Sequence, residues 1–549
     1  MSAVLKGRMP TASGTNRVNS PGAAAALPSK ARERRKQLSR PWDAGSLRDL
    51  LASTLRGDQI IVASSREPHA HQRLGAGVRV TQPASGLVTA VEPVVSACAG
   101  TWIAHGSGDA DFDFVDANDV WHAPAKGGPY RLRRLRLAED EQAGHGDGFS
   151  NSGLWPLCHM AHVRPSFSAA DWEHYRRVNQ RFAEAIVSEA TRPDPIVMVH
   201  DYQLALVPLL VRRLLPRATI VSFWHIPWAH SEQMGICPWL PELVEGMLGS
   251  DIVGFQTPRH VRNFVDSAAG IGGNGVCASG DDIVRGGHRS RVRHYPISIA
   301  WPTVAETKES PSIAQCRREA EARWSIPTEA KLIVGVDRLD YTKGLIERMR
   351  AIEQLLVSHP RWQGRLRFVQ VAAPTRSALH DYALLRAQLI AEAKRINARF
   401  RSDGPAPILL LDEQHDRASV NVLYRAAQVC LVTSLHDGMN LVCKEFVASR
   451  DDEQGVLVLS QFAGASHELC ASLVVNPYHV AQVADAVHCA LSMSAQEQRR
   501  RMRSLRETVR SQNVHRWAAR MLLDAACLRG ARSRGDTRRN ANAAAAAAS

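Results

Sequence analysis

Residues 332–359, LIVGVDRLDYTKGLIERMRAIEQLLVSH, decide the fold class of this chain. A short apolar run opens the stretch, a compact polar loop follows at 337–344, and the rest is amphipathic. A short strand, a loop and a helix form the repeating unit of a parallel sheet with crossover helices. The apolar positions of the amphipathic part recur at helical spacing, and they are Leu345, Met349, Ile352, Leu355 and Leu356.

The same alternation of short β-branched runs and longer helical patterns recurs along the chain, so the predicted fold class is α/β with parallel sheets. A chain of 549 residues can hold two domains with separate cores. The Ser/Pro/Glu-rich stretch 303–311 divides the strand series, and we place the domain boundary there, between a domain at 56–303 and one at 304–528. The runs expected to form strands are 59–63, 196–200, 220–224, 251–255, 332–336, 366–371, 408–411, 429–433, 456–459 and 473–475.

The formal net charge of +14 is concentrated at the two ends of the chain. Residues 1–42 hold nine basic side chains and one acidic one, and residues 529–540 hold five arginines and one aspartate. About +2 remains for everything between them, so the body gives no indication of a nucleic-acid-binding face.

The composition of the ends also differs from that of the body. Residues 1–55 are rich in Ser, Ala, Gly, Pro and Arg without hydrophobic periodicity, which predicts a disordered basic leader. Residues 529–549 finish in an Asn/Ala tract and are predicted to be a disordered tail, after last helices that cross back to the first domain. We expect a cytoplasmic protein. The leader is either a bland extension or a signal for export or delivery to a host cell.

The ten cysteines are scattered, with no C-x-x-C pair and no clustered histidine at metal-ligand spacing. This pattern is typical of reduced thiols rather than of a disulfide framework or a zinc site. The sequence has no uninterrupted apolar run of about 18 residues, so we expect no membrane span.

The loop at 337–344 is a candidate anion site. Arg338 and Lys343 lie five residues apart between a strand end and a helix start. Ligands of doubly wound folds bind at the carboxyl ends of parallel strands, and two cations beside free helix amides can hold a pyrophosphate. The alternative is a pair of ordinary surface cations, which the loop alone does not exclude.

A second polar cluster follows the strand at 429–433. Gly438 permits close backbone approach, and the helix expected to begin near Leu441 offers N–H groups to an anion or a hydroxyl. Glu445 lies in the first turns of this helix, where its carboxylate could accept hydrogen bonds from a ribose. Alternatively, it only complements the positive end of the helix dipole.

The first domain carries polar groups at strand ends as well. Asp201 follows the strand at 196–200 and could bond acceptor hydroxyls, and His225 follows the next strand and could bond a donor sugar. A single strand-end histidine is more often structural. Arg66, after the first strand, and the Ser85-Gly86-Leu87 turn complete the set.

Six blocks of this sequence closely resemble retaining glycosyltransferases of the trehalose-6-phosphate synthase family, glycosyltransferase family 20. The similarity extends from about Gln59 to about Ala525 and implies a GT-B fold, in which two Rossmann-like domains face each other across a cleft. The blocks are LWP (Leu154–Pro156), HDYQL (His200–Leu204), HIPW (His225–Trp228), DRLDYTKG (Asp337–Gly344), DGMNLVCKE (Asp437–Glu445) and GVLVLSQFAGA (Gly455–Ala465).

The resemblance implies transfer of glucose from UDP-glucose to glucose 6-phosphate with retention, and it assigns roles to the matching positions. The implied catalytic residues are Trp155, His225, Arg338, Lys343 and Asp437. The implied donor-binding residues are Ser85, Gly86, His415, Leu441, Val442, Cys443, Lys444 and Glu445. The implied acceptor-binding residues are Arg66, Asp201 and Arg376.

The residues agree with a metal-independent reaction. No paired carboxylates of glycosidase type are visible, and no Asp-x-Asp pattern occupies a suitable strand-end loop. Two cations and a helix terminus would instead stabilise the leaving diphosphate, so we expect no cofactor and no metal.

The chain departs from the family pattern in the acceptor region. Gly146 stands where a tyrosine usually contacts the acceptor phosphate, so either acceptor affinity is weaker or His145 substitutes for the phenol. A second and milder change is His436, in place of an arginine. In the donor-contacting pair, Ser85 stands where the family has its first glycine.

Three other activities compete with this interpretation. A glucosylglycerol-phosphate synthase shares the Arg-Glu-Pro opening at 66–68, but Arg376 favours a hexose phosphate acceptor. A cyclitol-joining pseudo-glycosyltransferase is a more distant relative, and a non-catalytic sugar-phosphate sensor would not need to keep Arg338, Lys343, Asp437 and Glu445 together. The expected partners are the small-molecule substrates, with no nucleic acid and no membrane, and a homo-oligomer is left open.

Overall fold

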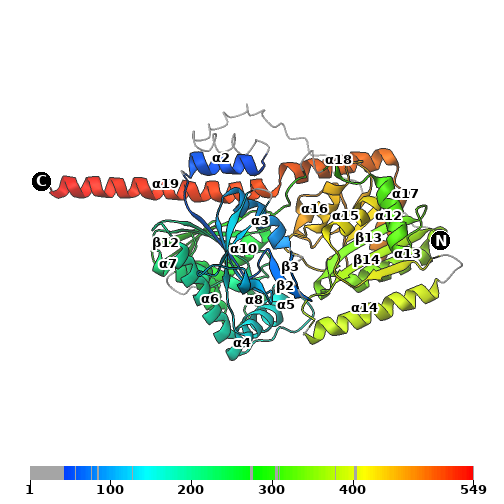
Figure 1. Ribbon diagram of the computed structural model, residues 1–549, viewed down its shortest axis with the longest axis horizontal. Helices are drawn as coiled ribbons and strands as arrows, with labels where there is room; N and C mark the ends of the chain where they lie inside the picture. The colour runs from blue at the N-terminus through cyan, green and yellow to red at the C-terminus, as the bar shows by residue number, and fades with distance from the viewer. Residues whose placement is uncertain are drawn as a thin grey trace, which may run out of the picture. The chain divides into compact units, whose positions relative to one another are not determined.

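A computed structural model describes residues 42–547 except 56, 76, 83–85, 126–127, 272–275, 303–306, 308, 378 and 401–404. Residues 1–41 of the expected leader, Ser85 and part of the expected domain boundary therefore lie outside the described residues. Two parallel-dominated sheets and their helices form the described fold (Figure 1).

The N-terminal sheet has the strand order β10-β11-β12-β9-β8-β7-β1-β4-β6-β5. Its pairs are parallel from β12 to β6, whereas β5, β10 and β11 pair antiparallel at the two edges. A separate hairpin joins β2 and β3. The strands are β1 Ile60–Ser64, β2 Ala70–Leu74, β3 Gly77–Thr81, β4 Thr101–His105, β5 Val120–Ala123, β6 Tyr130–Leu135, β7 Ile196–His200, β8 Thr219–Phe223, β9 Ile252–Phe255, β10 Val276–Ser279, β11 Asp282–Arg285 and β12 His288–His294.

The C-terminal sheet is parallel throughout, in the order β15-β14-β13-β16-β17-β18. Its central strands are mostly apolar and buried, as expected where helices cover both faces, although β14 also buries Arg367 and Gln370. The strands are β13 Lys331–Arg338, β14 Leu366–Ala373, β15 Ile408–Leu411, β16 Val429–Val432, β17 Val456–Ser460 and β18 Leu473–Val475.

The helices complete the crossover connections. In the N-terminal half they are α2 Ala44–Thr54, α3 Gly86–Ala97, η1 Asp111–Asp113, α4 Glu139–Gln142, η2 Ala143–Leu154, α5 Trp155–Cys158, α6 Ala169–Glu189, η3 Tyr202–Leu204, α7 Val207–Leu214, α8 Ser231–Met234, α9 Leu240–Met247 and α10 Pro258–Ile271. In the C-terminal half they are α12 Ile313–Trp324, η5 Tyr341–Lys343, α13 Leu345–Ser358, η6 Pro360–Trp362, α14 His380–Arg399, α15 Arg417–Ala426, α16 Val442–Ser449, η7 Gly464–His467, α17 Val480–Ser492, α18 Ala495–Ser511 and α19 Val514–Ala547.

The strand order of each sheet reverses at its centre. In the N-terminal sheet β1 lies between β4 and β7, and in the C-terminal sheet β13 lies between β14 and β16. Loops that leave the carboxyl ends of such strands diverge to opposite faces, and the crevice between them is where ligands bind in doubly wound folds. The functional site is therefore expected after β1, β7, β8, β13 and β16.

The ten predicted strands are all present, with ends within two residues of the expected ones. The prediction missed β4, β6 and β12, which extend the parallel part of the N-terminal sheet, and it missed β5, β10, β11 and the β2–β3 hairpin. The α/β fold class is confirmed.

The prediction that residues up to 55 are disordered is wrong for residues 44–54, which form α2. Asp43 caps this helix by accepting a hydrogen bond from the Ser46 amide at 2.7 Å. The leucines of α2 are buried, and α2 packs against α3 and α19 (Figure 1). A three-leucine stripe outweighed the Ser/Ala-rich composition that suggested disorder.

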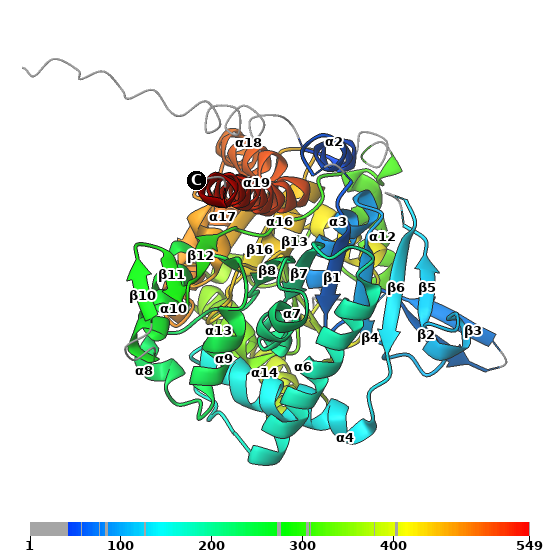
Figure 2. The same cartoon turned by 90° about the vertical axis from the view of Figure 1, so that its left-hand side faces the viewer.

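The predicted tail is likewise helical as far as Ala547, because α19 continues through it. Alanine has the highest helix propensity, so the Ala-rich end extends a helix that is already nucleated by packing. Arg529 anchors α19 to the N-terminal half, where its guanidinium lies 2.9 Å from Asp194 and 3.1 Å from Asp58. This helix crosses back to the N-terminal sheet, where Tyr295 donates a hydrogen bond to Asp524 at 2.7 Å (Figure 2).

Two truncations test which part of the first 55 residues contributes to the stability of the fold. Removing residues 2–40 is expected to leave the melting temperature unchanged, whereas removing residues 2–55 should lower it by several degrees. Leu47, Leu50 and Leu51 are buried, and each such side chain contributes about 1.5 kcal/mol or more to folding. Thermal unfolding followed by circular dichroism measures the difference, and equal melting temperatures would show that α2 contributes nothing.

Candidate active site

The loop after β13 holds Arg338 and Lys343 in place through a buried arginine beneath it. Arg348, on α13, is fully buried and donates to the Lys343 carbonyl at 3.2 Å, to Thr433 at 2.9 Å and to Asp337 at 2.8 Å. Gly344, with φ 65°, occupies the left-handed region where only glycine is unstrained. A Cβ there would also lie 2.4 Å from the Thr433 carbonyl. The loops after β13 and β16 are thus fixed against each other.

Lys343 and Asp437 form an ion pair between these loops. Lys343 Nζ donates to Asp437 Oδ2 at 2.6 Å, and Asn440 Nδ2 donates to the same oxygen at 3.2 Å. Burial alone would raise the pKa of Asp437, but Lys343 outweighs it and the pKa falls to about 2. At neutral pH Asp437 is therefore a carboxylate.

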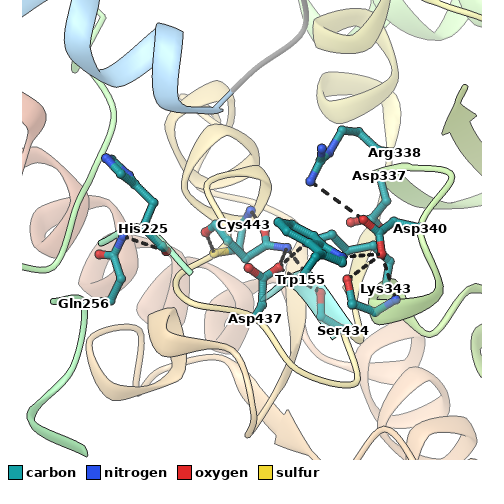
Figure 3. A network of polar contacts seen from close by, with 12 residues as sticks. Trp155, His225, Gln256, Asp337, Arg338, Asp340, Lys343, Ser434, Asp437 and Cys443 are labelled. Atoms are coloured by element: carbon teal, nitrogen blue, oxygen red, sulfur yellow. Dashed lines mark hydrogen bonds and ion pairs between the residues drawn. The ribbon is translucent and has the colours of Figure 1, made fainter. Parts of the chain in front are cut away.

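The two halves of the fold touch at Gly438. A Cβ on this residue would lie 2.3 Å from the carbonyl oxygen of His225, which follows β8 in the N-terminal sheet. Only glycine fits this approach. The loop that carries Asp437 is therefore held directly against the strand-end histidine of the other half (Figure 3).

Asp340 lies at the centre of the cationic groups. Its Oδ1 accepts hydrogen bonds from the Thr342 amide at 3.0 Å and from Trp155 Nε1 at 3.4 Å. Its Oδ2 lies 3.5 Å from Arg376 and 3.9 Å from Arg338. Although burial favours the neutral acid, Arg376 and Arg338 hold the pKa of Asp340 below its ordinary value. Asp340 is thus a buried anion that positions two arginines.

Trp155 packs under both of these arginines. The Arg376 guanidinium lies 4.1 Å from the centre of the Trp155 ring, and that of Arg338 lies 5.3 Å from it. Figure 3 shows the indole between the Asp437 loop and the Arg338–Asp340 group. The tryptophan of the LWP block therefore joins the N-terminal half to both cations.

Two phenols hold Arg376. Its guanidinium donates to Tyr382 at 2.5 Å and to Tyr202 at 3.2 Å, while its Nε is buried without a hydrogen-bond partner among the described residues. The backbone of Arg376 is strained, with φ 50°. A strained, buried arginine with a spare N–H is typical of a preorganised anion-binding group.

Arg66 and Asp201 face the same cluster from the N-terminal sheet. Burial, followed by the nearby charges of Arg338 and Arg376, lowers the pKa of Arg66 to about 10. Within the described part of the chain its guanidinium has no hydrogen bond and no ion pair. Burial raises the pKa of Asp201 to about 6, although the amides of Tyr202 and His225 and the charge of Arg66 oppose the shift.

His225 is a neutral imidazole at physiological pH. Its Nε2 lies 3.0 Å from His200 Nδ1, and burial together with His200 holds the pKa of His225 well below its ordinary value. His225 Nδ1 is left to interact with a ligand.

The start of α16 forms the other wall. The first helical bond runs from the Glu445 amide to the Leu441 carbonyl at 2.9 Å, so the amides of Leu441 and Val442 precede the helical ladder. Cys443 is buried, and its amide donates to Asn440 Oδ1 at 3.3 Å. Backbone N–H groups at this helix start are available to a sugar or a phosphate.

Lys444 and Glu445 differ in what their side chains can do. Lys444 Nζ is occupied, because it donates to the Ile297 carbonyl and to Glu468, both at 2.7 Å. Among the described residues, Glu445 accepts a single long hydrogen bond, from Tyr424 at 3.4 Å, and burial raises its pKa. Glu445 therefore keeps lone pairs for a ligand hydroxyl, whereas Lys444 joins the two halves.

The remaining donor-site predictions lie at the carboxyl edges of the sheets. His415 follows β15, and its buried Nε2 has no hydrogen-bond partner among the described residues. Gly86 begins α3, the crossover helix from β1 to β4. Its neighbour Ser85 lies outside the described residues.

The acceptor region lacks the expected phenol. A Cβ on Gly146 would meet nothing within 4 Å, so the position is open space. The suggestion that His145 substitutes for the tyrosine is wrong, because His145 is buried and its Nε2 lies 3.0 Å from the Gln203 carbonyl. His436 likewise faces a different hollow, outside the cationic cluster.

The structure also brings in residues that the sequence analysis did not single out, namely Asp340, Tyr202, Tyr382 and Arg348. Asp340 and Tyr202 belong to the DRLDYTKG and HDYQL blocks, so the resemblance of those blocks to the family could have identified them as site residues. Tyr382 and Arg348 lie on helices with ordinary amphipathic patterns and gave none. Among the described residues, no group of three or more His, Cys, Asp or Glu side chains could hold a metal ion.

Arg66, Arg338, Arg376 and Lys343 thus surround two carboxylates, Asp340 and Asp437, that are themselves ionised. The cations outnumber these anions and come from both halves of the fold. Such an arrangement suits two phosphate-bearing ligands brought together in a crevice between parallel sheets.

Known proteins with similar sequences and structures agree with this geometry. The sequence profile of glycosyltransferase family 20 matches residues 58–526. The chain is 37% identical over 478 residues to a trehalose-6-phosphate synthase of Mycobacterium marinum, which covers 85% of this chain and 93% of that protein.

Solved structures match over a similar length. One is described as trehalose-6-phosphate from E. coli bound with UDP-2-fluoro glucose, with a TM-score of 0.73, 30% identity and coverage of 85% of this chain and 99% of that one. Another is an α,α-trehalose-phosphate synthase (UDP-forming) from Burkholderia xenovorans in complex with glucose-6-phosphate, with a TM-score of 0.72, 34% identity and coverage of 85% and 99%. The two-sheet architecture is accordingly the GT-B fold that the resemblance implied, and the chain belongs to glycosyltransferase family 20.

Proposed function

We propose that this enzyme transfers glucose from UDP-glucose to glucose 6-phosphate with retention, which gives α,α-trehalose 6-phosphate and UDP. The observation that carries the proposal is the convergence of Arg66, Arg338, Arg376 and Lys343 on one crevice from both sheets. The similarity to synthases solved with a UDP-glucose analogue and with glucose 6-phosphate supports the choice of substrates.

The leaving diphosphate is assigned to the C-terminal loops. Arg338, Lys343 and the amides at the start of α16 would surround its oxygens, and Glu445 would accept from the ribose. As the bond to the anomeric carbon breaks, negative charge grows on the departing phosphate oxygen. That oxygen takes the proton of the acceptor hydroxyl on the same face of the sugar, so configuration is retained without a carboxylate nucleophile.

The acceptor phosphate is assigned to Arg66 and Arg376. Arg376 has a spare Nε–H, and Arg66 has no ion pair in the described part of the chain. Asp201 would accept from an acceptor hydroxyl, while neutral His225 and Asp437 would bond the donor glucose. In this assignment the acceptor groups come mainly from the N-terminal half and the diphosphate-binding groups come from the C-terminal half, while the donor glucose meets His225 and Asp437, one from each half.

Replacing Arg376 with alanine should raise the KM for glucose 6-phosphate about tenfold or more, with a much smaller change in the KM for UDP-glucose. The reason is that Arg376 is assigned to the acceptor phosphate and has no assigned contact with the donor. Steady-state kinetics with each substrate varied in turn measures the split, and Arg386→Ala, at a surface ion pair with Asp412, is the control. Equal effects on both KM values would contradict the assignment.

Restoring a tyrosine at position 146 should tighten binding of glucose 6-phosphate several-fold, by about 1 kcal/mol for one hydrogen bond. The open space around Gly146 accepts a larger side chain. Isothermal titration of the acceptor in the presence of UDP measures the gain. An unchanged or weaker affinity would mean that the acceptor phosphate sits elsewhere.

Product identification tests the whole proposal. Purified enzyme is incubated with UDP-glucose and, separately, glucose 6-phosphate or glycerol 3-phosphate, and the products are identified by NMR. Trehalose 6-phosphate is expected. A glycerol-linked product would favour the alternative synthase, and release of no UDP with any acceptor would favour a sensor.

We propose a cytosolic location. For residues 1–41 two predictions stand: they are a signal for export or delivery to a host cell, or they are an extension without a function of its own. Among the described residues, no helix is long and apolar enough to cross a membrane. Assembly into a homo-oligomer stays a prediction.

A further inference from the structure

A second hollow lies beside the catalytic loop, between the start of α10 and the segment 461–467. Its cavity volume is about 50 Å³, and it is partly open to solvent. Its N-terminal side is formed by Trp228, Arg259 and His260, and its C-terminal side by His436, Asp437 and His467. None of the cations assigned to the substrates lines it. We call it the α10 hollow.

The α10 hollow is positive and lacks a counter-charge. Arg259 is exposed and has no ion pair in the described part of the chain, and Asp437, the carboxylate in the wall, is already paired with Lys343 at 2.6 Å. The N-terminus of α10, which begins at Pro258, adds the positive end of a helix dipole.

His260 gives an independent sign of a missing ligand. His260 is only 5% exposed, and its Nδ1 has no hydrogen-bond partner among the described residues. Burial, together with His436 and Arg259, lowers the pKa of His260 to about 3, so the ring is neutral. A buried polar nitrogen without a partner is costly unless a ligand or a water satisfies it.

We propose that the α10 hollow binds the phosphate group of a small molecule through the guanidinium and amide of Arg259 and the imidazoles of His260 and His436. Pro258 has no N–H and the His260 amide already donates to Thr257, so Arg259 supplies the backbone donor at this helix start. A guanidinium fork, imidazole donors and one helix amide match the several acceptor oxygens of a phosphate better than the two of a carboxylate. The hollow shares Asp437 with the assigned donor-glucose site but contains none of the cations assigned to the two substrates.

The occupied site is coupled to the donor site through the backbone of the catalytic loop. His436 precedes Asp437, whose amide donates to the Phe462 carbonyl at 3.1 Å and whose carbonyl accepts from Gly464 at 3.2 Å. The Ala465 amide in turn donates to Met439 at 2.9 Å. A phosphate drawn between Arg259 and His436 thus acts on the loop that carries Asp437 and leads into α16.

Binding is tested with inorganic phosphate on the full-length chain, with UDP present to fill the diphosphate site. Wild type should show two classes of phosphate site by isothermal titration. Arg259→Gln should weaken one class about tenfold or more, and Arg376→Ala should weaken the other. Arg262→Gln, an exposed arginine on α10 that does not line the hollow, is the matched control and should keep both classes. A single class that Arg259→Gln leaves intact would overturn the proposal.

Coupling is tested in the Arg376→Ala background, where the hollow is the remaining phosphate site once UDP is bound. Phosphate should change the Kd for UDP about fivefold or more, and adding Arg259→Gln should abolish the change. Persistence of the change in the double variant would mean competition at the diphosphate site and would overturn the coupling. A parallel arm with glucose 6-phosphate distinguishes a sugar phosphate from free phosphate, and loss of either with Arg259→Gln supports the site. The readout is binding, so it stands apart from whether transfer to glucose 6-phosphate occurs.

Discussion

Replacing Arg338 with alanine is expected to lower kcat by about a hundredfold or more, because one of the two cations that stabilise the departing diphosphate is lost. The effect should appear in kcat and in kcat/KM alike, since the charge on the leaving oxygen develops only in the transition state. Steady-state turnover with UDP-glucose and glucose 6-phosphate measures it.

The fold should tolerate this change. Arg338 is about a quarter exposed, with a side-chain exposure of 27%, and its contact with Asp340 is long at 3.9 Å. Asp340 keeps Arg376 at 3.5 Å and the hydrogen bonds of Thr342. An unchanged melting temperature together with near-normal turnover would show that Arg338 does not stabilise the leaving group. The variant Arg338→Lys tests whether a positive charge alone suffices or the planar guanidinium is needed.

The C-terminal half could be predicted closely because each of its strands contains a run of mostly apolar residues. Strands such as β16 and β17 are buried along their length, so hydrophobicity alone located them. The N-terminal half was predicted less completely. Its strand β6 reads YRLRRL, and its inward face includes Arg134, which is buried and paired with Glu67 at 3.0 Å. A strand whose buried face carries a paired charge has no apolar alternation to detect.

The site shows the same limit. Strand-end position pointed to Arg338, Lys343, Asp437 and His225, because in a parallel sheet position along the chain fixes which edge a residue reaches. The partners that orient these residues come from helix interiors. Arg348 on α13 looks like a surface charge in the sequence, yet it is fully buried under the loop that holds Lys343. Such contacts depend on the packing of helices onto the sheet, which local pattern does not encode.

Removing Lys343 is expected to cost both turnover and stability. Lys343→Gln should lower kcat by about a hundredfold or more, for the same leaving-group reason as Arg338. It also leaves Asp437 buried without its cation, and breaking a buried pair by removing one partner costs about 3 kcal/mol or more. Urea unfolding measures the loss of stability, which Arg338→Ala should not show.

The direction in which the stability of Lys343→Gln changes with pH tests whether the unpaired Asp437 carboxylate causes the loss of stability. In the wild type, Lys343 holds the pKa of Asp437 at about 2, so the pair stabilises the fold above the ordinary pKa of aspartate and is lost as pH falls towards 2. Without Lys343, burial raises that pKa above the unfolded value. The variant should then recover part of its stability at lower pH, where Asp437 is protonated, and lose it as pH rises.

A double variant separates the two roles of Lys343. Adding Asp437→Asn to Lys343→Gln removes the unpaired charge, so the free energy of unfolding should return towards that of the wild type and become independent of pH in this range. Turnover should stay low, because the leaving diphosphate still lacks Lys343 and the donor glucose has lost Asp437. Recovery of turnover along with stability would mean that Lys343 serves only to neutralise Asp437, and the leaving group would then depend on Arg338 and the amides of α16 alone.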